Sequence, residues 1–63
     1  MKFKKGDRVL IMGNIDDYTD HLDGKIGIVI CSRPDRNDIE VKVPGTSGTW
    51  MIWNHNATLV EDI

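Results

Sequence analysis

The stretch HLDGKIGIVI, residues 21–30, combines two glycines with a run of aliphatic residues. The run extends from residue 25 to residue 31, a length typical of a strand bounded by turn residues. Gly24 fits a turn that enters this strand. Gly27 lies inside the strand pattern, where a missing side chain indicates a bulge, a sharp bend or a close approach. We therefore predict a bent scaffold strand that helps a short sheet to close on itself.

The alternative for these glycines is a loop that cradles phosphate. The segment GKIG lacks the longer glycine spacing and the Lys-Ser/Thr ending of a P-loop. No helical pattern follows that would present its N-terminus to an anion. The sequence therefore favours scaffold over a nucleotide-binding loop.

Further strand patterns lie on both sides of this stretch. IEVKV, residues 39–43, alternates cleanly, which predicts Ile39, Val41 and Val43 inside and Glu40 and Lys42 in water. Other strands are expected at residues 8–12, 49–53 and 58–61. In the first of these, Val9 and Ile11 share one face.

The connections complete the expected architecture. Residues 13–24 form a long first loop, in which Ile15, Tyr18 and Leu22 are anchors to the core. A turn over residues 32–38, a glycine-bearing connection over 44–48 and a helical turn over 53–57 join the other strands. We expect one all-β domain over residues 1–63, built as a five-stranded barrel.

Composition limits the class of function. The chain has 63 residues and a formal net charge of −2, and so small a domain has little room for a deep catalytic cleft. Its single cysteine excludes an internal disulfide and a cysteine-based zinc site, and no apolar signal or membrane segment is present. We expect a cytoplasmic, non-enzymatic protein without a cofactor.

Several segments together resemble a known family. KKGDRVLI, HLDGKIGIVI, DIEVKV and NATLVE resemble the Src-homology-3-like small barrels, especially the KOW-type and related branches with a "GD-x-V" opening and a "G-x-x-G-x-V" second strand. The resemblance covers nearly the whole chain and implies a five-stranded barrel. Similar stand-alone proteins occur among bacterial and bacteriophage products.

The family resemblance implies binding without naming the partner. Its members bind RNA, ribosomal or polymerase surfaces, or peptides. The ALYDY-type opening and adjacent tryptophans of the peptide-binding eukaryotic members are absent, since Trp50 and Trp53 lie three positions apart. In a regular strand these two side chains fall on opposite faces, so one is expected in the core and the other exposed as a contact platform. The alternative is that the second tryptophan also packs, under the long loop.

Recognition of another protein is the leading hypothesis. The acidic loop segment DDYTDHLD matches no calcium-binding spacing, so we predict no metal site and instead acceptors for a basic partner surface. The predicted partner-binding residues are Asp16, Asp17, Tyr18, Asp20, His21 and Trp53. His55 is expected to have a turn or capping role.

Self-association is expected from the second strand. Ile26, Ile28 and Ile30 fall on one face, and Val29 and Cys31 fall on the other. Both faces are therefore apolar, so one is either covered by the long loop or available for a second copy of the chain. On the same pattern Cys31 is expected to be a small core residue.

Binding of nucleic acid or of a nucleotide-like ligand is the alternative. Basic residues would hold phosphates, an exposed aromatic ring would stack a base, and the 44–49 connection would offer hydroxyl groups. The residues predicted for this alternative are Lys4, Lys5, Arg8, Lys25, Arg33, Arg36, Thr46 and Ser47. The negative net charge disfavours it.

Overall fold

The computed structural model describes residues 3–13 and 20–62. Its strands are β1 (Arg8–Ile11), β2 (Ile26–Arg33), β3 (Asp38–Lys42), β4 (Trp50–Trp53) and β5 (Ala57–Leu59). Its 3₁₀ helices are η1 (Asp20–Leu22), η2 (Asn54–Asn56) and η3 (Val60–Asp62). This confirms the predicted all-β class, its five strands and the helical turn before the last strand.

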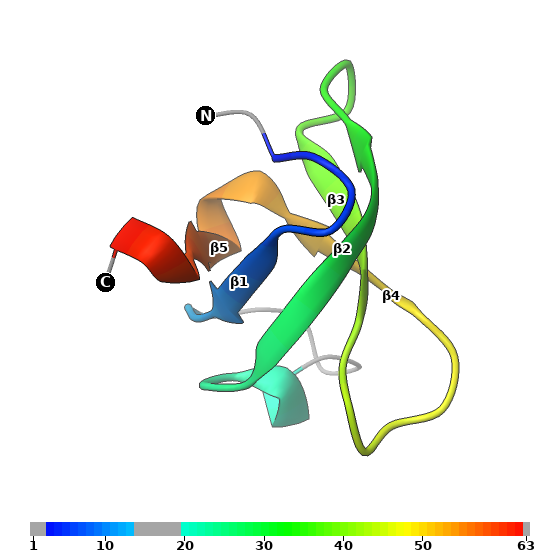
Figure 1. Ribbon diagram of the computed structural model, residues 1–63, viewed down its shortest axis with the longest axis vertical. Helices are drawn as coiled ribbons and strands as arrows, with labels where there is room; N and C mark the ends of the chain where they lie inside the picture. The colour runs from blue at the N-terminus through cyan, green and yellow to red at the C-terminus, as the bar shows by residue number, and fades with distance from the viewer. Residues whose placement is uncertain (1–2, 14–19, 63) are drawn as a thin grey trace.

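The strands form one antiparallel sheet in the order β4-β3-β2-β1-β5. The eight-residue strand β2 is the longest, and it pairs with β1 near its start and with β3 along the rest of its length. Figure 1 shows the sheet curling, so that β4 and β5, at the ends of the strand order, are joined by the short turn containing η2. Strand β2 thereby links both halves of the sheet.

The core lies on the concave face of this sheet. Val9, Ile11 and Ile39 are fully buried, and Val41 and Val43 are buried beside them, as the alternation in both strands predicts. Leu22 of η1 is also fully buried, which confirms its predicted role as a loop anchor. The other predicted anchors, Ile15 and Tyr18, lie outside the described residues.

Gly27 is explained by close packing. It is buried, and it pairs with Val9 of β1. A Cβ atom at this position would lie 3.3 Å from Cβ of Val41 and 3.4 Å from Cγ2 of Val43. Of the predicted possibilities, the structure shows a close approach, made by core side chains of the neighbouring strand.

A bulge in β2 corrects the prediction for Cys31. The register with β3 shifts between Val29 and Cys31, so Ile30 has no partner in the register. An extra residue reverses the alternation beyond it. Val29 is therefore buried while Cys31 is exposed, paired with Glu40. The prediction of Cys31 as a core residue was wrong because it assumed strict alternation, which the inserted residue interrupts.

Several strand boundaries also differ from the prediction. Strand β2 continues to Arg33, because Arg33 pairs with Asp38 at the start of β3 and leaves only residues 34–37 for the turn. In this turn Asn37 has φ 60°, a conformation that asparagine tolerates. The closing strand begins earlier than predicted, at Ala57, and gives way to η3 at Val60.

Candidate functional site

The two tryptophans of β4 lie in different environments, as expected from their spacing. Trp53 is 52% exposed, and its ring stacks on the ring of His55 with centroids 6.3 Å apart and planes 10° from parallel. Trp50 packs against the core, and its Nε1–H donates to Thr46 Oγ1 at 3.0 Å. Trp53 is therefore the tryptophan available to a partner.

A shallow pocket lies beside the ring of His55. Asn37, Asn54, His55 and Ala57 line it, and its volume is about 470 Å³. The backbone N–H of Asn54 donates to the carbonyl oxygen of Asn37 at 2.7 Å, which ties η2 to the β2–β3 turn. Asn54 Oδ1 is buried without a hydrogen-bond partner among the described residues. A buried acceptor without a partner is costly, so the Asn54 amide would gain by turning toward a donor of a ligand in this pocket.

The 3₁₀ helix η2, which carries Asn54 and His55, is anchored to the residue that follows β1. Asn56 is buried, and its Nδ2 donates to the carbonyl oxygen of Met12 at 3.0 Å. The backbone N–H of Met12 donates in return to the carbonyl oxygen of Asn56 at 2.8 Å. This reciprocal pair fixes η2, so Asn54 and His55 are presented by a constrained turn.

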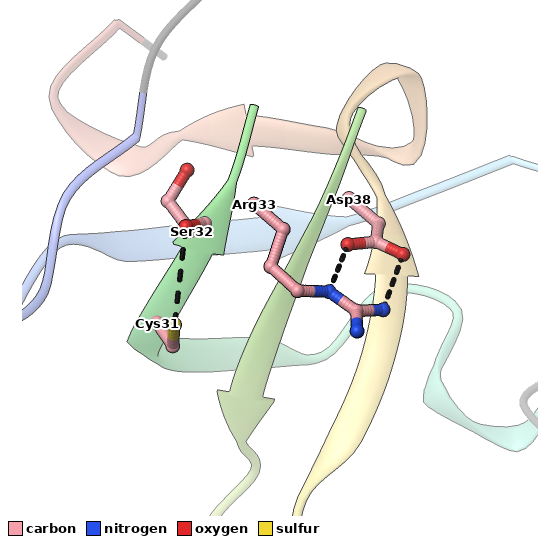
Figure 2. A network of polar contacts seen from close by, with 4 residues as sticks. All are labelled: Cys31, Ser32, Arg33 and Asp38. Carbon is pink, nitrogen blue, oxygen red and sulfur yellow. Dashed lines mark hydrogen bonds and ion pairs between the residues drawn. The ribbon is translucent and has the colours of Figure 1, made fainter. Parts of the chain in front are cut away.

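A partly buried ion pair lies next to Trp53. Arg33 donates from Nε and Nη2 to the two carboxylate oxygens of Asp38, both at 2.8 Å (Figure 2). Asp38 pairs in turn with Trp53 in the register of β3 and β4. The hydrogen bonds from Arg33 lower the pKa of Asp38 despite its burial, and the same bonds raise the pKa of Arg33. The pair thus stays charged and fixed beside the indole.

The structure separates the predicted partner-binding residues. Asp20 is the first residue of η1, and His21 is exposed with its ring edge against Trp50, at a centroid distance of 5.1 Å. His21 therefore accompanies the inner tryptophan, whereas Trp53 faces outward on β4. The remaining predicted residues lie outside the described residues: Asp16, Asp17 and Tyr18.

Sequence reasoning missed most of the pocket. Asn37 and Asn54 were not candidates, and His55 was assigned only a turn role. The run WNHN after a strand is the one local signal for this site, because it places polar side chains directly beyond an exposed aromatic residue. Asn37 reaches the pocket from a turn seventeen residues earlier, which no local pattern indicates.

Two of the residues predicted to bind anions already have partners. The Thr46 hydroxyl donates to the carbonyl oxygen of Val43 at 2.8 Å and accepts from Trp50, so it serves the connection itself. Arg33 is held by Asp38 through two bonds. Ser47, in contrast, is exposed in the same connection as Thr46.

The other predicted basic residues are exposed but spread over the molecule. Lys25 precedes β2, while Arg36 lies in the turn beyond its far end, so the length of β2 separates them (Figure 1). Lys4 and Lys5 lie in a turn before β1, and Arg8 is the first residue of β1. The fold does not bring all these cations into one patch.

A metal site, a membrane-spanning helix and related proteins were each considered. In residues 3–13 and 20–62, no group of three metal-ligating side chains is gathered, and no helix is long and apolar enough to cross a membrane. Comparison of the chain with protein-family models, curated proteins and solved structures finds no match.

Proposed function

We propose that this chain is a cytoplasmic, non-catalytic protein-binding module of the Src-homology-3-like kind. It would accept an apolar or aromatic side chain of a partner on Trp53 and a hydrogen-bond donor in the adjacent pocket. The observation that supports this best is the half-exposed Trp53 indole, stacked on His55 at the edge of a pocket with an unpartnered acceptor.

The chemistry of the site suits a polypeptide ligand. A tryptophan buries a large, flat surface at low cost in side-chain entropy, which is why it is frequent at binding hot spots. Asn54 Oδ1 accepts hydrogen bonds, so it matches a backbone or side-chain N–H group. An apolar side chain packed on Trp53 and an N–H group donating to Asn54 would together require a segment of the partner rather than a single residue.

The predicted acidic loop would add to this recognition. Asp16, Asp17 and Asp20 remain predicted acceptors for a basic partner surface, and Tyr18 a predicted anchor. Charges at the rim of an interface mainly raise the association rate. We therefore expect partner association to slow with added salt while the Trp53 contact persists.

Trp53→Ala, compared with Met12→Ala, tests the proposal. Both residues are 52% exposed in the folded protein, so each variant removes an apolar side chain that is about half in water. Partner capture should be lost in Trp53→Ala and retained in Met12→Ala, with both circular dichroism spectra unchanged. Equal capture by the two variants would refute the Trp53 site.

Nucleic-acid binding remains a second candidate because Lys4, Lys5 and Arg8 are close in sequence and all exposed. Such binding should be tight at low salt and weaken steeply as salt rises. Fluorescence anisotropy with single-stranded DNA and RNA measures this directly. Absence of binding at low salt would remove the candidate. Weaker binding by Lys4→Glu, with an unchanged circular dichroism spectrum, would locate the site near Lys4.

A further inference from the structure

The outer face of the sheet, facing away from the core, has an ordered arrangement of charge and apolar surface. The register aligns side chains of neighbouring strands in rows across the sheet. Two adjacent rows cross its middle, the first made of Arg8, Ile28 and Lys42, the second of Cys31, Glu40 and Met51.

The apolar members of these rows have no role in the core. Ile26 and Ile28 on β2 are 47% and 42% exposed, and Met51 on β4 is 44% exposed. Glu40 and Lys42 of β3 lie between Met51 and the two isoleucines. Burying large apolar side chains is favourable. The face therefore has a reason to be covered by another protein surface.

The charges on β3 indicate what covers it. Glu40 and Lys42 are two residues apart on the same face, so they lie about 7 Å apart along the strand. A twofold axis in the interface plane, crossing β3 between them, places Glu40 of one copy opposite Lys42 of the other. The same operation places Lys42 of the first copy opposite Glu40 of the second, so both pairs form together.

The apolar neighbours are compatible with the same operation. On β2, the axis passes between Ile28 and Cys31, so each of these residues faces the other across the interface. No like charges of β3 oppose each other in this arrangement. We infer that the outer face is a self-complementary surface that pairs with the outer face of a second copy of this chain.

The size of the face sets the strength of this dimer. The molecule measures 24 × 22 × 22 Å, so one face contributes a contact at the low end of the range for specific interfaces. The dimer is therefore weak and reversible, and it grows with protein concentration. Trp53 lies on the same face, in the row next to that of Glu40 and Met51, so self-pairing and partner binding need separate measurements.

Charge reversal tests the pairing in both directions. Lys42→Glu and Glu40→Lys should each weaken self-association by about tenfold or more, because like charges then face each other. The double variant Lys42→Glu/Glu40→Lys should dimerise again. An equimolar mixture of the two single variants should form a heterodimer, because the two acidic side chains of one variant then face the two lysines of the other. Sedimentation equilibrium over a concentration series measures each species.

Arg36→Glu is the matched control, because it reverses an exposed charge in the β2–β3 turn, away from the two rows. It should self-associate like the unchanged protein, and circular dichroism should show all variants folded. A protein that stays monomeric at high micromolar concentration, or single variants that fail to form a heterodimer, would overturn the inference. Partner capture by the monomeric Lys42→Glu variant tests the Trp53 site separately.

Discussion

The two faces of the β2–β3–β4 sheet differ in what their apolar residues do. On the inner face Val29, Ile39 and Ile52 are at most 1% exposed. On the outer face Ile28 and Met51 keep more than two fifths of their surface in water. Folding explains the inner residues through burial, but it gives no reason for the outer ones. The outer residues form the surface on which we infer self-pairing.

The strongest way to break this comparison is a truncation on the inner face. Ile39→Ala should lower the free energy of unfolding by about 2–5 kcal/mol, because it leaves a cavity in a fully buried position. In so small a domain this is a large share of the total stability. Urea denaturation followed by circular dichroism measures it.

The control for that experiment lies one strand away. Ile28→Ala removes the same atoms from the outer face, where the side chain is already 42% exposed. Its effect on the free energy of unfolding should be clearly smaller than that of Ile39→Ala. Equal losses in the two variants would contradict the distinction between the faces.

The next largest effect should come from Gly27. In Gly27→Ala, the new Cβ would lie 3.3 Å from Cβ of Val41, so the core must shift, at a cost of about 1–3 kcal/mol. Thermal unfolding should show the loss, whereas Lys42→Ala on the outer face should leave the midpoint nearly unchanged. A Gly27→Ala variant as stable as the unchanged protein would show that Val41 and Val43 can move aside, and would contradict the expected loss.

Acid should weaken the link between β2 and β3. Hydrogen bonds from Arg33 lower the pKa of Asp38 below its ordinary value of 3.8, so the folded state binds this proton less readily than the unfolded state. The contribution is complete above that value and is lost as pH falls through the lower pKa of the folded state. Thermal unfolding of the protein and of Asp38→Asn should be compared between about pH 6 and about pH 2, the range over which carboxyl groups titrate. The variant should lose less stability in acid, and parallel curves would contradict this.

The smallest effect is expected at Cys31. Because its side chain is exposed beyond the bulge, Cys31→Ser should change the free energy of unfolding by less than about 0.5 kcal/mol. The native thiol should also react readily with a maleimide at low protein concentration. A thiol that does not react, together with a strongly destabilised Cys31→Ser variant, would show that Cys31 is in the core and would contradict the bulge.

Local patterns were sufficient for much of the fold. Ile39, Val41 and Val43 were predicted inside because burial on one face of a strand requires every second residue to be apolar. Leu22 was predicted as an anchor because it is an aliphatic residue within a polar loop. These properties depend on neighbours in sequence, so the sequence carries them directly.

The candidate site was predictable only in part. The spacing of Trp50 and Trp53 predicted that one would be exposed, and the structure identifies Trp53. The pocket required Asn37 and Asn54 to meet across the β2–β3 turn and η2, through a backbone hydrogen bond between distant positions. Such a meeting depends on how the sheet curls, which alternation does not describe.

The sequence by itself determined that five strands exist and which side chains of β1 and β3 face the core, because burial selects a two-residue period along a regular strand. Only the tertiary structure decided the exposure of Cys31, the pocket beside His55 and the rows that place Glu40 and Lys42 amid apolar residues. These depend on the register between strands, in which one inserted residue reverses the facing of all that follow it.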